Sequence, residues 1–348
     1  MSLVPPFLLL DRYEITAEIG RGGNAVVFRA HDRVLDRAVA VKVLRDDSLS
    51  SDTLVRFRQE VRVTARLEHA HILHVYDTGE YEGRPYIVME LASGRSLHER
   101  LEREGQLPIM DALHIARDVG LALAHAHARR VVHRDVKPEN ILLASGGAIL
   151  GDFGIARVTT EDIARKITST GTAVGTVLYM SPEQLCAEPN IDERSDQYSL
   201  ACVLYEMLAG VRPHISASFA GLRMLRMTGQ HLPVSAHRPR VSPAVSNAII
   251  TAMSPLVADR FRNMDDFLAA LGVGASTEFQ IADGSDVEPT SGGAGAMRGD
   301  SSGPAVTPSV GTVSSRISAL PVWQRWAIAV VVLAAVVVGG LMAAQRGF

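Results

Sequence analysis

The chain has 348 residues, a formal net charge of −3 and two cysteines, Cys186 and Cys202. This length gives room for about two or three domains, and 47% hydrophobic with 21% charged residues is ordinary for a globular protein. The weakly acidic balance gives no reason to expect nucleic acid as a partner. Two cysteines are too few for a disulfide framework, which fits a reducing compartment.

The first part of the chain is expected to form a sheet. After a short apolar lead-in over 1–12, which lacks the basic start of a secretory signal peptide, β-type runs alternate with turn or charged residues. The runs cover 13–15, 25–30, 38–43, 72–77 and 85–91. Between the third and fourth runs, four apolar residues recur at helical spacing: Leu54, Phe57, Val61 and Ala65. The pattern predicts a mostly antiparallel sheet with one major helix.

From Ser96 onward the pattern becomes helical. Helices are expected over 113–128, 195–209, 245–253 and 265–271. From 273 to 322 the composition shifts to Gly, Ser, Ala, Pro and Thr, with Phe279 as the only aromatic residue. Such a segment cannot bury enough apolar surface to fold, so a disordered linker is predicted there.

The stretch 326–344 runs for nineteen residues without a charged or amide side chain. About 20 apolar residues cross a bilayer as a helix, and Trp323 and Trp326 stand where interfacial aromatic anchors occur. A buried core helix or strand pair is the alternative, but the preceding linker leaves no domain nearby to bury it. We therefore predict a single transmembrane helix over 323–345.

Two motifs stand close together in the middle of the chain. The run from His133 to Asn140 reads H-R-D-V-K-P-E-N, and D-F-G begins twelve residues later at Asp152. Phosphoryl transfer from ATP needs an oriented hydroxyl, metal ions on the phosphates and positive charge over the developing negative charge. An aspartate, a lysine, an asparagine and a second aspartate at this spacing supply those parts.

These motifs resemble those of protein kinases. The longer runs V-H-R-D-V-K-P-E-N-I-L-L, D-F-G-I-A-R and G-T-V-L-Y-M-S-P-E-Q are similar to bacterial serine/threonine kinases of the eukaryotic-like (Hanks) type. The resemblance covers 13–272 and implies the α+β, bilobal protein kinase fold. It divides that range into a β-rich N-lobe over 13–91 and a helical C-lobe over 95–272. ATP, Mg²⁺ and protein substrates are implied with it.

The resemblance also implies the catalytic roles. Asp135 is the expected base that orients the substrate hydroxyl, and Lys137 neutralises charge on the transferred group. Asn140 and Asp152 are expected to hold magnesium, which prefers oxygen ligands. On the third strand, Lys42 ends V-A-V-K and is expected to contact the α- and β-phosphates. Its expected partner is Glu60 on the following helix.

The nucleotide is expected between a glycine-rich loop and the segment that joins the lobes. The loop G-R-G-G-N-A-V-V lets backbone N–H groups approach the phosphates, although Ala25 stands where a third glycine is usual. Met89 is expected at the back of the adenine pocket, and Glu90 and Ala92 offer backbone groups to the base. The expected nucleotide contacts are Ile19, Gly20, Arg21, Gly22, Gly23, Val27, Ala40, Lys42, Met89, Glu90, Ala92 and Leu142.

The segment after D-F-G is rich in hydroxyl groups. In kinases with an arginine at the position of Arg134, a phosphate on this activation loop pairs with that arginine and orders the loop. By analogy with the bacterial family, Thr168 and Thr170 are the expected autophosphorylation sites. Thr176 is expected to hydrogen-bond Asp135 and Lys137 and to mark specificity for Ser and Thr.

Several residues are expected to be structural rather than chemical. An ion pair is expected between Glu183 and Arg260, and Asp196 is expected to brace the catalytic-loop backbone. His133 is expected to pack near Phe153 instead of acting as a base. Two further histidines, His125 and His127, precede this loop and are expected to be packing residues.

The sequence favours a membrane-anchored serine/threonine kinase over two alternatives. A pseudokinase that acts as a scaffold is disfavoured because the lysine, both aspartates, the asparagine and Glu60 are all present; ATP turnover separates the two. A kinase-fold enzyme for small molecules is disfavoured by Lys137, Thr176 and the acceptor-rich loop. Because the cosubstrate is ATP and no signal peptide is evident, the kinase domain is expected on the cytoplasmic side of a cell membrane. Homodimerisation through the N-lobe for trans-autophosphorylation is a hypothesis from family analogy.

Overall fold

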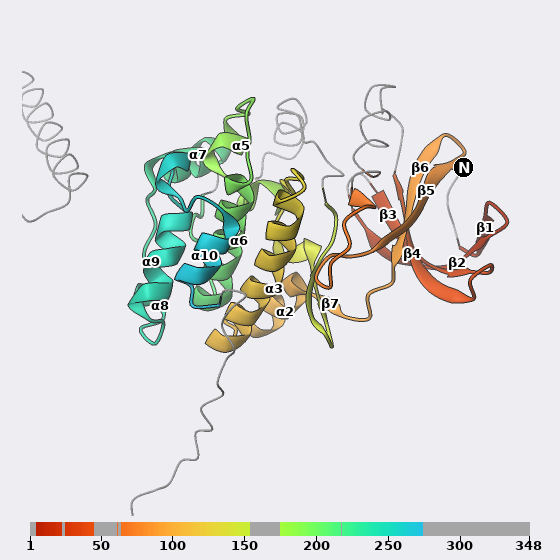
Figure 1. The fold of residues 1–348 in the computed structure, drawn as a ribbon, viewed down its shortest axis with the longest axis horizontal. Helices are drawn as coiled ribbons and strands as arrows, with labels where there is room; N and C mark the ends of the chain where they lie inside the picture. Colours follow the sequence, from red (N-terminus) through yellow and green to blue (C-terminus); the bar gives the residue numbers. More distant parts are fainter. Residues whose placement is uncertain are drawn as a thin grey trace, which may run out of the picture. The chain divides into compact units, whose positions relative to one another are not determined.

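The computed structural model describes residues 5–22, 25–44, 61, 64–153, 175–216 and 218–273. Strands gather in the N-terminal part of this range and helices in the C-terminal part, which form two lobes side by side (Figure 1). The helix expected to carry Glu60 and the span expected over 323–345 lie outside the described residues. Within the described ranges, no helix combines the length and the hydropathy that crossing a membrane requires.

The N-lobe is one antiparallel sheet with the strand order β1-β2-β3-β4-β6-β5. Alternate residues of its strands point to one side, so Phe28 and Val41 are buried together in a single N-lobe core. Its strands are β1 Phe7–Leu9, β2 Tyr13–Arg21, β3 Ala25–Asp32, β4 Arg37–Leu44, β5 Val75–Tyr81 and β6 Arg84–Glu90. The expected lead-in is therefore wrong in part, because residues 7–9 form a strand that pairs with 13–15.

The C-lobe holds a second, small sheet and most of the helices. The sheet has the order β7-β8-β9, with β7 Arg95–Ser96, β8 Ile141–Ala144 and β9 Gly147–Leu150, and the sequence pattern did not predict it. The helices are α2 Leu97–Glu104, α3 Ile109–His127, α5 Pro182–Leu185, α6 Arg194–Ala209, α7 Phe219–Thr228, α8 Val234–His237, α9 Pro243–Ala252 and α10 Met264–Ala270. Short 3-10 turns are η1 Pro138–Asn140, η2 Gly175–Leu178 and η3 Val257–Asp259.

Helix α6 is the centre of the C-lobe. Its residues are buried on nearly every side, including Asp196 and Tyr198 at its start, and α3, α9 and α10 pack around it. A helix that is apolar all round belongs in a core. It stops at Gly210, which takes a left-handed conformation with φ of 72° that glycine adopts at little cost. The catalytic loop and the segment before α5 both rest on this rigid helix.

Two stretches of chain connect the lobes. In the first, over 64–74, Leu67 and Ile72 belong to the C-lobe core, and Leu73 N donates to Leu150 O at 2.9 Å. In the second, over 91–94, Gly94 lies so close to β8 that an added Cβ would be 1.6 Å from the Leu143 carbonyl oxygen. Glycine is therefore required at this position.

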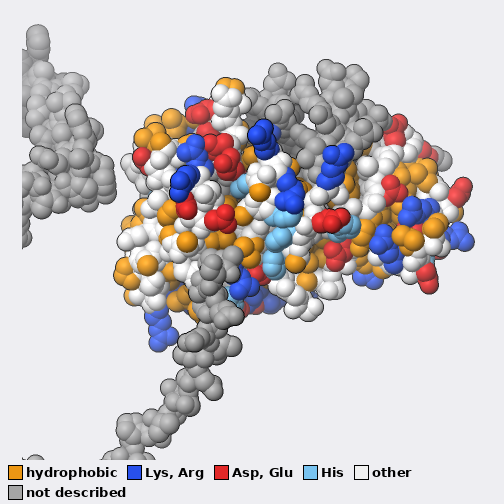
Figure 2. Space-filling model, in the orientation of Figure 1, with side chains coloured by type: hydrophobic (Ala, Val, Ile, Leu, Met, Phe, Trp, Pro, Cys, Tyr) orange, Lys and Arg blue, Asp and Glu red, His pale blue; other side chains and the backbone are white. Residues whose placement is uncertain are grey.

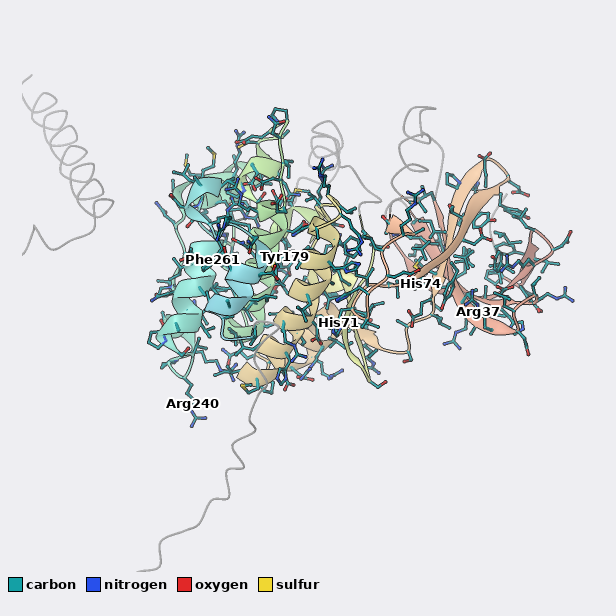
Figure 3. The ribbon with its side chains drawn as sticks, in the orientation of Figure 1. Arg37, His71, His74, Tyr179, Arg240 and Phe261 are labelled. Carbon is teal, nitrogen blue, oxygen red and sulfur yellow. The ribbon has the colours of Figure 1, made fainter. Side chains whose placement is uncertain are left out.

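Histidine rings pack the first connecting stretch, 64–74, against α3. The His69 ring centroid lies 5.0 Å from that of His125 on α3 and 5.5 Å from that of His71. His71 Nδ1 is 2.9 Å from the Ala148 carbonyl oxygen on β9. Histidine side chains gather in the middle of one face in Figure 2, where His71 is labelled in Figure 3. His125 therefore packs, as expected from the sequence.

Candidate active site

The catalytic loop between α3 and β8 draws three expected residues together. Lys137 Nζ lies 2.7 Å from Asp135 Oδ2, and Asn140 Nδ2 donates to the same oxygen at 3.1 Å. The Asn140 amide also donates to the Asp135 carbonyl oxygen at 2.8 Å. Pro138 begins the turn η1, where its fixed φ and missing N–H cost nothing. The Asp135 carboxylate is thus held in place by a cation and an amide.

Asp152 follows β9 and meets Lys42 from the other lobe. Lys42 Nζ lies 2.7 Å from Asp152 Oδ1. The backbone of Asp152 has φ of 59°, a strained conformation for a residue with a side chain, of the kind that clusters at functional sites. Desolvation opposes ionisation of this carboxyl, but the charge of Lys42 outweighs it and lowers the pKa. Lys42 therefore has a partner that the sequence did not reveal, and Glu60 lies outside the described residues.

The expected nucleotide contacts of the N-lobe lie opposite one another on four neighbouring strands. Gly20 on β2 is opposite Val27 on β3, and Val27 is opposite Lys42 on β4. On the same strand, buried Ala40 is opposite buried Met89 on β6. These five side chains or backbones therefore line one region of the sheet.

The remaining nucleotide contacts are placed in part. In the glycine-rich loop, Gly22 N donates to the Ala25 carbonyl oxygen at 2.9 Å. Glu90 N donates to the His74 carbonyl oxygen at 2.9 Å, where β6 ends. From the C-lobe sheet, Leu142 on β8 is the expected apolar contact. Gly23 lies outside the described residues, while Ile19, Arg21 and Ala92 are described but have no contact that assigns them to a nucleotide.

The donor set fits magnesium. Since Asn140 donates through Nδ2, its Oδ1 is left as an oxygen ligand, and Asp152 offers Oδ2 beside the oxygen that Lys42 engages. Magnesium in phosphate sites uses one or two carboxylates together with substrate phosphates. Among the residues that the structure covers, no group of three or more His, Cys, Asp or Glu could hold a metal by itself.

Asp196 braces the catalytic loop from α6. It is fully buried, and its carboxylate accepts hydrogen bonds from His133 N at 2.8 Å and Arg134 N at 2.7 Å. Desolvation opposes ionisation of Asp196, but its hydrogen bond to His127, at 2.8 Å, and the charges around it lower the pKa. His127 thus has a polar partner that its place in an Ala-His-Ala-His run did not predict.

Replacing Asp196 by Asn is expected to lower the free energy of unfolding by about 2 kcal/mol, since hydrogen bonds to a charged group are lost. An amide group in that place turns N–H toward backbone donors that need an acceptor. Urea denaturation measures the loss. Asp259→Asn, at an exposed carboxylate, is the control and should change stability by less than about 0.5 kcal/mol. Equal stability of the two variants would contradict the bracing role.

His133 is occupied on both ring nitrogens. Nε2 lies 2.9 Å from the Gly151 carbonyl oxygen, and Nδ1 accepts from Asp135 N at 3.2 Å. Its ring packs edge to face on Phe153 with centroids 4.5 Å apart. A histidine engaged in this way orients the loop and does not face a substrate, in agreement with the structural role expected for it.

The ion pair expected between Glu183 and Arg260 is present and buried. Arg260 Nη1 and Nη2 donate to the two carboxylate oxygens, each at 2.8 Å. Ser195 Oγ donates to Glu183 Oε1 at 2.6 Å. Next to this pair, Gln184 Nε2 donates to the Arg134 carbonyl oxygen at 2.7 Å, a contact that sequence patterns do not predict. The Thr176 side chain and the loop with Thr168 and Thr170 lie outside the described residues.

Comparison with known proteins agrees with this geometry. A family model described as "Protein kinase domain" matches residues 13–253. The chain is 38% identical over 276 residues to "Probable serine/threonine-protein kinase PknB" of Corynebacterium glutamicum, a match that covers 76% of this chain and 42% of that protein. It is 37% identical over 273 residues to "Serine/threonine-protein kinase PknB" of Mycobacterium leprae, covering 77% of this chain and 43% of that protein.

A third relative gives the same result. The "Serine/threonine-protein kinase PknB" of Mycolicibacterium smegmatis is 38% identical over 275 residues, which are 77% of this chain and 44% of that protein. The match thus spans less than half the length of these relatives. Because the family model covers most of the chain and both lobes, the chain belongs to the protein kinase family.

Proposed function

We propose that this chain is a serine/threonine protein kinase that transfers the γ-phosphate of ATP to hydroxyl groups of proteins, with Mg²⁺ as cofactor. The observation that carries the proposal is the catalytic loop, where Lys137 Nζ and Asn140 Nδ2 meet Asp135 Oδ2 at 2.7 and 3.1 Å. The names of the relatives support specificity for Ser and Thr.

Each residue has a chemical role in this reaction. Asp135 orients the substrate hydroxyl and takes its proton as the new O–Pγ bond forms and the bond from Pγ to the β-phosphate oxygen breaks. Lys137 places positive charge beside the transferred group. Lys42 contacts the α- and β-phosphates, and Asn140 and Asp152 supply oxygen ligands. Magnesium held by Asn140 and Asp152 would supply positive charge that neutralises the phosphate oxygens.

Regulation by the activation loop fits the fixed backbone of Arg134. Its N–H is held by Asp196 and its carbonyl oxygen by Gln184, at 2.7 Å each, and its φ of 68° is strained. The base of its side chain therefore stays in one place next to Asp135. A phosphate on Thr168 or Thr170 would order the loop by pairing with Arg134.

Autophosphorylation of the full chain tests the proposal. We expect Mg-ATP to place phosphate on Thr168 or Thr170, as mapped by mass spectrometry, and we expect no incorporation in Asp135→Asn. A folded wild-type protein that binds ATP but phosphorylates neither itself nor a generic protein substrate would favour a pseudokinase scaffold instead. Phosphate found only on an added small molecule would favour the kinase-fold enzyme for small molecules.

We also propose anchoring in a cell membrane by a single helix over 323–345, with the kinase domain in the cytoplasm. The apolar sequence of that stretch supports it, and the linker predicted over 273–322 would have an r.m.s. reach of about 35–40 Å as a flexible coil. Full-length protein should remain with lipid vesicles in a flotation assay, whereas a variant lacking 323–345 should not. Homodimers for trans-autophosphorylation predict a rate that rises with protein concentration; a rate independent of it would count against them.

A further inference from the structure

Arg226 on α7 is a fully buried cation whose hydrogen-bond partners are backbone carbonyl groups. Its side chain is 0% exposed. Burying a charge is costly unless a carboxylate or several hydrogen bonds compensate. Over the described part of the chain Arg226 forms no ion pair; instead Nη1 donates to the carbonyl oxygens of Val177, at 2.9 Å, and Met180, and Nη2 donates to that of Leu178. The carbonyl groups of one short backbone segment thus compensate for burying the charge of the Arg226 guanidinium.

The carbonyl group of Tyr179, which lies between Leu178 and Met180, also accepts a hydrogen bond from a side chain. Ser199 Oγ on α6 donates to the Tyr179 carbonyl oxygen at 2.8 Å. Four consecutive carbonyl groups, 177–180, therefore accept hydrogen bonds from α6 and α7. The Tyr179 ring, labelled among the C-lobe helices in Figure 3, is itself fixed by its hydroxyl, which donates to Glu206 Oε2 at 2.5 Å. The backbone of this segment has little freedom to change shape while Arg226 is in place.

Among the residues that the structure describes, no carboxylate forms an ion pair with Arg226. His214 is 2% exposed, and both of its ring nitrogens lack hydrogen-bond partners within the described residues. Burial, the charge of Arg226 and the neighbouring His231 lower the pKa of His214 to about 3. Leu222 of α7 and Leu185 of α5 pack with Val177 and Met180 in one buried apolar cluster. The carbonyls and the guanidinium therefore depend on each other.

The same segment leads directly to the catalytic loop. Ser181 caps α5, whose Gln184 holds the Arg134 carbonyl oxygen at 2.7 Å, one residue before Asp135. Val177, Tyr179 and Met180 are buried, whereas Leu178 is partly exposed. The hydrogen bond between Gln184 and Arg134 links this segment, through α5, to the loop that carries Asp135, the base proposed to receive the substrate hydroxyl. The backbone shape of the segment therefore bears on the surface beside that loop.

We propose that Arg226 is a positioning residue for protein substrates: through three carbonyl groups it fixes the backbone of 177–180 in the shape that binds the chain around the phosphorylated hydroxyl. The proposal rests on the kinase function proposed above. Arg226 is argued to act on the segment and not on ATP, so its effect should appear in the KM for a peptide and not in the KM for ATP.

The test compares Arg226→Met and Arg226→Lys with Arg223→Met in the full-length protein. Methionine keeps most of the apolar length, lysine keeps the charge but cannot reach three carbonyls at once, and Arg223 is exposed on the same helix. The probe is a peptide of residues 162–176 of this chain, which contains Thr168 and Thr170. We expect the peptide KM to rise about tenfold in Arg226→Met. The rise should be smaller in Arg226→Lys, and Arg223→Met should have none; the KM for ATP should stay within about twofold in all three.

Two results would overturn the proposal. One is a peptide KM that changes less than about twofold in a folded Arg226 variant; the other is an equal rise in the KM for ATP, which marks general destabilisation. If Arg226→Met does not fold, Arg226→Lys and Ser199→Ala decide, because each removes carbonyl hydrogen bonds from the same segment and should raise the peptide KM.

A second readout separates this proposal from the kinase function. Hydrogen–deuterium exchange of the amides of 177–180 should speed up in Arg226→Lys and not in Arg223→Met. Binding of the 162–176 peptide carrying a fluorescent label should weaken in parallel. A wild-type protein without phosphoryl transfer would sink the proposed function alone. Unchanged exchange and unchanged peptide binding would sink the positioning role alone.

Discussion

Replacing Asp135 by Asn is expected to lower the rate of phosphoryl transfer to a peptide about 10³-fold while the protein stays folded. The amide still accepts hydrogen bonds from Lys137 and Asn140, which now meet Asp135 Oδ2 at 2.7 and 3.1 Å, so the loop keeps its shape. It cannot, however, take the proton of the attacking hydroxyl. Initial rates at saturating Mg-ATP measure the loss, and thermal unfolding checks the fold.

Asp36→Asn is the matched control for this experiment, because the Asp36 side chain is 94% exposed at the turn between β3 and β4. We expect it to leave the rate within about twofold of the wild type. A folded Asp135→Asn protein that retains more than about a tenth of the wild-type rate would show that another group, or water, accepts the proton.

Breaking the pair between Glu183 and Arg260 is expected to have the largest effect on stability. Removing one partner leaves the other as an uncompensated buried charge, which costs about 3–5 kcal/mol. The side chains are 0% and 5% exposed for Arg260 and Glu183. Arg260→Met, measured by urea denaturation, should lose free energy of unfolding in this range. Arg262→Ala is the control, because that side chain is 85% exposed beside Asp266 and its pair is worth about 0.5 kcal/mol.

The pH dependence of stability tests the ion pair of Glu183 and Arg260 independently. Desolvation opposes ionisation of Glu183, but hydrogen bonds and charge from Arg260 outweigh it and lower the pKa below its ordinary value of 4.5. A carboxyl of this kind contributes stability that is present above its unfolded pKa and is lost as pH falls through the folded one. The gap in stability between wild type and Glu183→Gln should therefore shrink below pH 4.5. A gap that stays constant between neutral and acidic pH would mean that the ionised form of Glu183 is not what stabilises the fold.

The catalytic centre could be placed from the sequence because its parts are local. Asp135, Lys137 and Asn140 lie within six residues, so their contacts follow from one loop and its proline. The ion pair of Glu183 with Arg260 is distant in the chain, and only the family resemblance predicted it. The strands β3 and β4 and helix α6 were expected close to their observed bounds because their apolar patterns are long and regular. Strand β2 was expected only over 13–15 but extends to Arg21.

What the sequence did not reveal depends on contacts between distant elements. The strand β1 is three residues long, too short for alternation to mark it, and it is stabilised by pairing with β2 and by packing of Phe7 and Leu9 on the N-lobe core. Lys42 meets Asp152 across 110 positions of chain. Residue type alone predicts that an arginine such as Arg226 is exposed to solvent. Its helix also contains Arg223 and three other polar or small positions, which gives no sign of burial. Its carbonyl partners become evident only in the folded chain.

The two stretches that connect the lobes, 64–74 and 91–94, have a mechanical consequence. The first is seated in the C-lobe core by Leu67 and Ile72, and the second is pinned where Gly94 touches β8. We expect a lobe attached along two such lines to rotate about the axis that joins them. Lys42 and Asp152 belong to opposite lobes, so the 2.7 Å between their charged atoms would lengthen as the angle between the lobes opens. The opening angle would then set both the access of the proposed nucleotide and the pairing of these two charges.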